Sequence, residues 1–160
     1  MEVWTTGSAS PRGIMREAPR LEAGGWDGLL VVDSQNLSGD PYVSLAMAAT
    51  VTERLGLGTG VSNSVTRVAA VTAASIESVN RVSRGRAVLG IGRGDSALAH
   101  LGRAPARVAS FERYVAQVQA YLSGKSVPFE DIDIDEAIAP PMAELGFAGA
   151  PESSRIGWIS

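Results

Sequence analysis

Apolar residues along the chain change their spacing several times, and each change marks a switch between a strand and a helix. The run Val3 to Thr6 is short and β-prone, and it ends at a glycine. Apolar positions at helical spacing follow, and then 28–33 is a continuous apolar run, typical of a strand covered on both faces. The alternation then repeats. The predicted strands are 3–6, 28–33, 55–61 and 86–92, and the predicted helices are 14–21, 40–54, 68–82 and 106–122.

Two prolines bear on where the predicted helices begin. Asp40-Pro41 combines an acidic N-cap with a proline in the first turn, which is a helix-start signal. Pro19 instead lies inside the first helical segment. Because proline removes a backbone donor there, we expect this helix to be kinked or to begin near Ala18.

Four successive strand-then-helix units indicate the fold class. The units repeat at about 30 residues, and parallel strands need crossover connections of that length, which are usually helices. The pattern therefore predicts an α/β fold with a parallel sheet. An open doubly wound sheet and a barrel share this local pattern, so the periodicity alone leaves both architectures open.

The last part of the chain, 125–160, departs from this alternation and is treated as a region separate from 1–124. Residues 125–135 are acidic and alternate with apolar positions, which predicts a short edge strand, a hairpin arm or a solvated acidic loop. The aspartates have the spacing of a calcium loop, but Glu136 stands where that loop requires glycine, so no metal site is expected.

Prolines and a late apolar run mark the end of the chain. Pro140, Pro141 and Pro151 break any helix in this part of the sequence. The run 156–159 then has the composition of a strand, and we expect it to begin a fifth strand.

Composition excludes several classes of protein. The chain has 160 residues, 45% of them apolar, and 14 basic against 17 acidic side chains give a net charge of −3. No basic face for nucleic acid is expected. The absence of cysteine excludes disulfides and thiolate sites, and a single histidine is too few for a His-rich metal site. Without a signal-like start or an apolar run of about 20 residues, a cytoplasmic protein with no membrane span is expected.

Small and polar residues follow each predicted strand. In parallel α/β folds, ligands bind beyond the carboxyl ends of the strands, so these positions are the candidate site. All four segments are polar or glycine-rich, as a cleft for a planar ligand would require. They are 5–7, 33–34, 59–63 and 92–96.

Several of these residues have alternative interpretations. The glycines at 58 and 60 could accommodate a bulge. Asp33 could anchor a loop or contact a ligand, and His100 could be a general base or a surface residue. The glycine-rich run 90–94 lacks the last glycine of a dinucleotide fingerprint, since Asp95 stands there. Four arginines near strand starts are expected to be solvated: Arg54, Arg81, Arg84 and Arg86.

Four stretches of the chain form a recognisable set. They are Glu22-Ala-Gly-Gly-Trp-Asp-Gly-Leu29, Asp40-Pro-Tyr-Val43, Leu55-Gly-Leu-Gly-Thr-Gly-Val-Ser-Asn63 and Gly85-Arg-Ala-Val-Leu-Gly-Ile-Gly-Arg-Gly-Asp-Ser96. Taken together, these stretches resemble the luciferase-like monooxygenase superfamily, in its branch of coenzyme F420-dependent oxidoreductases. The resemblance covers 1–124 well and the remainder loosely.

The resemblance implies a fold and a cofactor site. Members are TIM (β/α)8 barrels, so this chain would be about half of one. The peptide bond between Gly60 and Val61 is expected to be cis and to support a deazaflavin ring from behind. Where many members have a histidine, this chain has a serine at 34, so no acid–base role carries over. The residues expected to contact the cofactor are Asp33, Ser34, Thr59, Gly60, Val61, Asn63, Gly92, Arg93, Gly94, Asp95 and Ser96.

Three functions follow from the resemblance. The first is an F420-dependent oxidoreductase that passes hydride between the deazaflavin and a small organic substrate, in a chain that lacks the second half of the barrel. The second is an FMN-dependent monooxygenase. The third is a half barrel without catalytic activity that forms a homo-oligomer or is completed by a second chain, since two sheet edges would be exposed.

Overall fold

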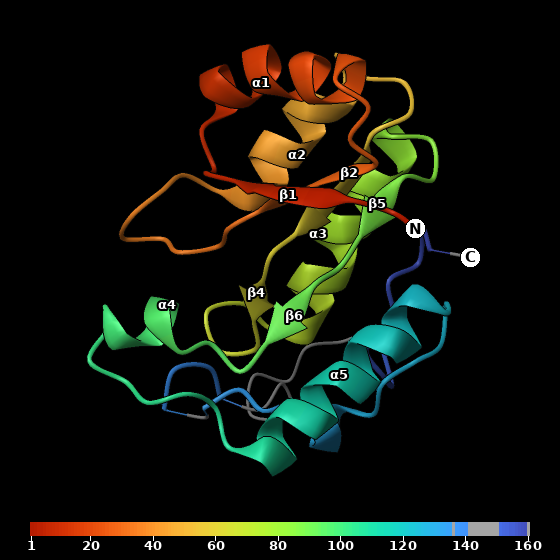
Figure 1. Cartoon of the computed structure of the whole chain (residues 1–160). Helices are drawn as coiled ribbons and strands as arrows, with labels where there is room; N and C mark the ends of the chain where they lie inside the picture. Colours follow the sequence, from red (N-terminus) through yellow and green to blue (C-terminus); the bar gives the residue numbers. More distant parts are fainter. Residues whose placement is uncertain (136, 141–150, 160) are drawn as a thin grey trace.

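The computed structural model describes residues 1–135, 137–140 and 151–159, and within them a parallel sheet forms the centre of the fold (Figure 1). Its four strands are β1 (Trp4–Gly7), β2 (Gly28–Val31), β3 (Gly56–Thr59) and β5 (Ala87–Val88), in that spatial order and all parallel. The predicted parallel α/β class is therefore confirmed.

Two of the predicted strands differ from the structure. The predicted strand 86–92 is divided into β5 and β6 (Ile91–Gly92), whereas 55–61 is shortened to β3 and a separate strand, β4 (Ser62–Asn63), follows it. The strands β4 and β6 form their own parallel ladder beyond the main sheet. The hydroxyl of Thr59 donates to the carbonyl oxygen of Gly90 at 2.6 Å, which ties the end of β3 to the segment between β5 and β6.

Four of the described helices follow the strands as predicted, with shifted ends, and the short helix at Ser96–Ala99 was not predicted. They are α1 (Pro11–Ala23), α2 (Pro41–Ala49), α3 (Ala69–Val82), the short α4 (Ser96–Ala99) and α5 (Val108–Leu122). In Figure 1, α1 and α5 lie at opposite ends of the molecule, with α2 and α3 between them. None of these described helices is long and apolar enough to cross a membrane.

The start of α1 corrects the expectation drawn from Pro19. The helix begins at Pro11 with Ser10 as its N-cap, and Pro19 lies within it. Ile14 and Ala18 of this helix are fully buried in the core. Both precede the proline, and Leu21 after it packs against the same core. Burial on both sides of Pro19 thus offsets the missing backbone hydrogen bond, so the proposed start near Ala18 was wrong. The N-cap at Asp40 is confirmed, because its Oδ1 accepts from the amides of Tyr42 and Val43.

The two faces of the sheet differ in how they are covered. Leu29, Val31 and Leu57 point toward α1 and α2 and are fully buried. On the opposite face the indole of Trp4 lies over the glycines of β2 and β3, where an added Cβ would meet the ring at 2.1 and 2.5 Å. Val88 on this face is exposed. One face of the sheet is thus packed and the other is open, as in a section of barrel wall.

The region after α5 agrees with the solvated acidic loop among the predicted alternatives, and not with an edge strand or hairpin arm. Val127 and Ser154 form an isolated antiparallel bridge, and Phe129–Asp131 is a 3₁₀ turn. Ile132 packs against the core formed by α3 and α5, while the acidic residues beside it are exposed. The alternation around Ile132 therefore reflects packing of one side on the core, and the described residues 128–135 form no strand.

The expected fifth strand is also not formed by 156–159, whose described residues make a turn. Ile159 is buried, and Arg81 donates to the carbonyl oxygen of Trp158 at 2.6 Å while its guanidinium lies 5.0 Å from the indole centre. These contacts fix the segment as a turn against α3. The expectations at Glu136 and Pro141 lie outside the described residues, and the division of the chain at residue 124 stays a prediction.

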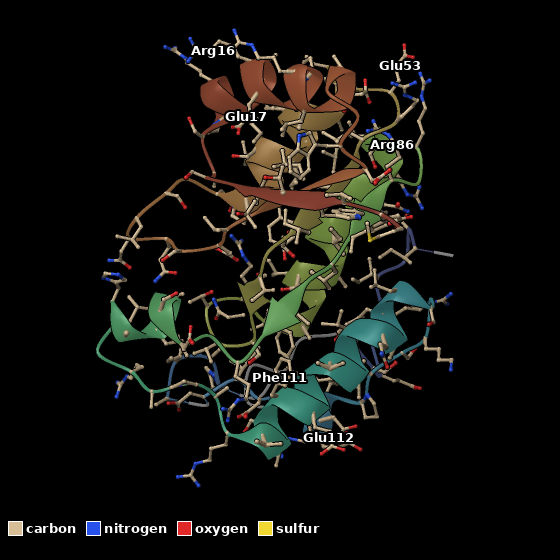
Figure 2. The ribbon with its side chains drawn as sticks, viewed as in Figure 1. Arg16, Glu17, Glu53, Arg86, Phe111 and Glu112 are labelled. Carbon is tan, nitrogen blue, oxygen red and sulfur yellow. The ribbon has the colours of Figure 1, made fainter. Side chains whose placement is uncertain are left out.

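Arg86 lies at the amino-terminal ends of the strands (Figure 2), where its guanidinium forms a dense hydrogen-bond network. Its guanidinium donates to the carbonyl oxygens of Leu55 at 2.6 Å and Thr52 at 2.9 Å, to the Thr52 hydroxyl, and to the carbonyl oxygens of Ala49 and Ser83. The expectation that Arg86 is a solvated charge was therefore wrong. Arg86 joins the end of α2 to the starts of β3 and β5.

Candidate active site

A cavity of about 470 Å³ lies at the carboxyl ends of the strands. It is bounded by the segment after β2, by the β3–β4 junction and by the turn between β6 and α4. All of the predicted site residues line it except Thr59. The lining residues are Val32, Asp33, Ser34, Gly60, Val61, Asn63, Gly92, Arg93, Gly94, Asp95, Ser96, Ala97 and Pro105.

Asp33 connects two strand ends beneath this cavity. Its side chain is buried, and the Ser62 hydroxyl donates to its Oδ2 at 2.6 Å. The same oxygen lies 3.8 Å from Nε of Arg67, which is too far for a hydrogen bond but close enough for a strong charge interaction. Asp33 is therefore a cross-strand anchor that also lines the cavity, and its contact with a ligand stays a prediction.

Arg67 is shared between two aspartates. Its Nη2 donates to Oδ2 of Asp40 at 2.6 Å, and its guanidinium lies 4.9 Å from the ring centre of Tyr42. Burial alone would raise the pKa of the Asp40 carboxyl, but the amide of Val43 and the Arg67 guanidinium outweigh burial and lower this pKa overall. Asp40 is thereby kept ionised at the start of α2, and it holds Arg67 next to Asp33.

The β3–β4 junction forms one wall of the cavity. The Gly60–Val61 peptide bond is cis, as the resemblance implied. Val61 exposes 52% of its surface and lines the cavity, so it adds an apolar side chain to this wall. An added Cβ at Gly60 would lie 2.6 Å from Cβ of Leu30, so only glycine allows this junction to pack against β2. Thr59 is buried and holds Gly90, which explains why it does not line the cavity.

The turn after β6 forms the facing wall. Gly94 has a φ of +78°, and an added Cβ would lie 2.8 Å from Cβ of Asn63. The Asp95 carboxylate accepts from the Ser96 amide, and Arg93 donates to the carbonyl oxygen of Ala106 at 3.2 Å. The side chains of this turn are thus used to shape the wall, and the glycine lets it approach β4 closely.

A comparison with known proteins identifies the family. A model of the family described as luciferase-like monooxygenase matches residues 2–139. This chain belongs to the luciferase-like monooxygenase family. Its fold agrees, because the solved structures that it resembles are luciferase-like TIM barrels and the chain covers about half of each. The predicted half barrel is confirmed.

The curated relatives of this family member include archaeal reductases. A 5,10-methylenetetrahydromethanopterin reductase of Methanolobus tindarius is 44% identical over 84 residues, which make up 52% of this chain and 26% of that protein. A protein of the same name from Archaeoglobus fulgidus is 40% identical over 74 residues, or 46% of this chain and 22% of that protein. The matches thus span about a quarter of the relatives' length.

Two solved structures show the shared fold. The coenzyme F420 dependent tetrahydromethanopterin reductase from Methanopyrus kandleri superposes with a TM-score of 0.70 at 22% identity, covering 84% of this chain and 44% of that one. The oxygenating constituent of 3,6-diketocamphane monooxygenase from Pseudomonas putida, solved in complex with FMN, gives 0.66 at 16% identity, covering 79% and 41%. At these identities the likeness concerns the fold.

Sequence reasoning missed part of this luciferase-like site. Arg67 was not considered, although it follows Ser62 closely on the same strand-to-helix connection. Gln35 was also missed, and its amide donates to the carbonyl oxygen of Ala97 at 3.0 Å, which joins the loop after β2 to α4. His100, the candidate general base, is exposed at the end of α4 and does not line the cavity.

A second cavity, of about 450 Å³, lies between the start of α3 and α5. Ser64 and Tyr114 are among its lining residues. The Tyr114 hydroxyl lies 2.6 Å from that of Thr72, and burial raises the pKa of Tyr114 to about 12. This phenol stays neutral across the physiological range, so it supplies a hydrogen bond that holds α3 against α5.

Proposed function

We propose that this chain is the cofactor-holding part of an F420-dependent oxidoreductase that moves hydride between a deazaflavin and a small organic substrate. The cavity at the strand ends carries the proposal, because it combines a glycine-built wall with an exposed apolar side chain at Val61. The relatives named as methylenetetrahydromethanopterin reductases support the reaction class and make a methylene-bearing pterin the first substrate to test.

The residues of the cavity fit a flat ring. Gly60 and Gly94 occupy positions where a Cβ would collide with neighbouring side chains, so glycine lets each wall pack closely at these points. Val61 would contact one face of the ring, and 92–96 would contact its edge or its attached chain. A bound deazaflavin supplies the hydride chemistry, and this chain orients the ring and keeps water from one of its faces.

FMN is the second candidate cofactor. The fold is shared with a monooxygenase solved in complex with FMN, and the residues above would accept either ring system. The two proposals differ in the cofactor that binds more tightly, so one titration distinguishes them.

We also propose that the site is completed by four further strand-helix units. The strands β1 and β5 are the two edges of the main sheet, and the chain covers 44% of the related F420-dependent structure. The units would come from the rest of a longer chain, from a second copy of this chain or from another chain, since exposed edges of parallel sheets invite pairing.

The test is a fluorescence titration of the chain with coenzyme F420 and with FMN, with the mass of the binding species measured by light scattering. We expect F420 to bind more tightly than FMN. Val61→Asp should weaken binding at least tenfold because it places a charge against the ring, whereas the similarly exposed Val71→Asp on α3 should not. A two-copy barrel predicts a mass near 33 kDa, twice 16.6 kDa. The absence of binding to both rings would contradict the proposed function.

A further inference from the structure

Two buried polar side chains on the cavity wall lack partners. Ser34 is 7% exposed and Asn63 is 1% exposed. Among the described residues, neither Oγ of Ser34 nor Nδ2 of Asn63 has a hydrogen-bond partner, and both residues line the cavity. Buried polar groups in native proteins are nearly always paired, so two unpaired ones in one cavity point to a ligand.

The orientation of the Asn63 amide is fixed by its other end. Its Oδ1 accepts from the amides of Val65 and Thr66, both at 3.0 Å, and from the Thr66 hydroxyl at 3.2 Å. A reversed amide would set its NH₂ group against these amide donors, so the free atom is the nitrogen. Asn63 therefore keeps an unpaired hydrogen-bond donor in the wall of the cavity.

The position of Ser34 is likewise set by its backbone. Its carbonyl oxygen accepts from the amides of Leu37 at 2.9 Å and Ser38 at 3.0 Å, which forms the turn after β2. The hydroxyl takes no part in this turn. Ser34 is held at the cavity wall with its hydroxyl free to donate or accept.

We propose that Ser34 and Asn63 are the residues that recognise the carbonyl-bearing edge of the ring bound in this cavity. The inference rests on the proposed function and names two ligand-specificity residues within it. The pyrimidinedione ring shared by flavins and deazaflavins carries two carbonyl oxygens, which are the acceptors that the Asn63 amide requires. Ser34 stands where many family members have a histidine, so this chain would offer a neutral hydroxyl to the ligand at that position.

The experiment compares three variants by fluorescence titration with coenzyme F420 and FMN. Ser34→Ala should raise the dissociation constants about tenfold, as expected for one lost hydrogen bond. Asn63→Asp keeps an oxygen for the Val65 and Thr66 amides but sets a carboxylate against the ligand carbonyl, and it should weaken binding more. Ser64→Ala is the matched control, because its buried hydroxyl also lacks a partner among the described residues but lines the other cavity.

Stability provides a second readout. Since the Ser34 hydroxyl has no partner to lose, Ser34→Ala should leave the melting temperature of the ligand-free chain unchanged or higher. A wild-type chain that binds a ring while Ser34→Ala binds it equally well would overturn the inference alone. A clear drop in the melting temperature of Ser34→Ala would also overturn it. A wild-type chain that binds neither ring would contradict the proposed function, and the inference with it.

Discussion

The two ends of the parallel sheet differ in how their polar groups are satisfied. At the amino-terminal ends of the strands, Glu22 accepts from the backbone amides of residues 53–55, and Arg86 donates to four carbonyl oxygens and a hydroxyl. At the carboxyl ends, Ser34 and Asn63 each keep a buried polar atom without a partner among the described residues. One end is built for stability, and the other is the end at which we propose that a ligand binds, as in TIM barrels generally.

The largest effect is expected from breaking the network at the amino-terminal ends. Arg86→Ala removes the donor that serves the carbonyl oxygens of Ala49, Thr52, Leu55 and Ser83. Several acceptors are then left unpaired in partly buried positions. We expect a loss of about 3 kcal/mol in the free energy of unfolding, measured by urea denaturation.

The control for this variant is Arg54→Ala, at the same end of the sheet. Arg54 is exposed, and replacing its side chain should change the free energy of unfolding by about 0.5 kcal/mol or less. Equal losses in the two variants would show that the Arg86 network adds no stability and would remove the contrast between the two ends.

A smaller loss is expected from changing the shape of the carboxyl end. Gly94→Ala introduces a Cβ at 2.8 Å from Cβ of Asn63 and places alanine at a φ of +78°. Together these should cost about 2 kcal/mol in the free energy of unfolding. The variant should also weaken the binding of F420 and FMN, because the wall moves away from β4.

Gly102→Ala separates the two causes. Gly102 has a φ of +67°, but an added Cβ there would meet nothing within 4 Å. The Gly102→Ala variant should therefore lose about 1 kcal/mol in the free energy of unfolding, from the backbone conformation alone, and should keep its affinity for the ring. If Gly94→Ala were no less stable than Gly102→Ala, the close approach of the turn to Asn63 would contribute nothing to the stability of the folded chain.

Much of the carboxyl end could be predicted from the sequence. A site at the ends of parallel strands is drawn from residues next to each strand, so the polar positions after 28–33, 55–61 and 86–92 mark it directly. Almost all of the predicted residues line one cavity for this reason. Thr59 is the exception, since side chains alternate along a strand and its hydroxyl faces Gly90.

The amino-terminal end was harder to predict, because its interactions depend on the tertiary fold. Arg86 has the sequence context of a surface charge, and its carbonyl partners lie about 30 residues earlier in the chain. The predictions for the helix that contains Pro19 and for the segment 156–159 were wrong for the same reason. In both, burial against another element outweighs the local signal.

The smallest expected effect tests the other half of the amino-terminal network. Burial opposes ionisation of Glu22, but the amides of Arg54, Leu55 and Glu53 outweigh it and lower the pKa of the Glu22 carboxyl below its ordinary value of 4.5. Glu22→Gln keeps the shape but weakens these charge-assisted bonds. Because the group is partly solvated, we expect a loss of only about 1 kcal/mol in the free energy of unfolding near neutral pH.

The pH dependence of this variant tests the direction in which folding shifts the pKa of the Glu22 carboxyl. A carboxyl with a lowered folded pKa binds fewer protons in the folded state, so its stabilisation is complete above the ordinary pKa and is lost as the pH falls through the folded value. Glutamine does not titrate. The difference in unfolding free energy between wild type and Glu22→Gln should therefore stay constant from about pH 7 to about pH 5 and shrink at lower pH. A difference that grew on acidification would mean that the folded chain binds the Glu22 proton more tightly than the unfolded one, and the amides of 53–55 would then not be holding a carboxylate.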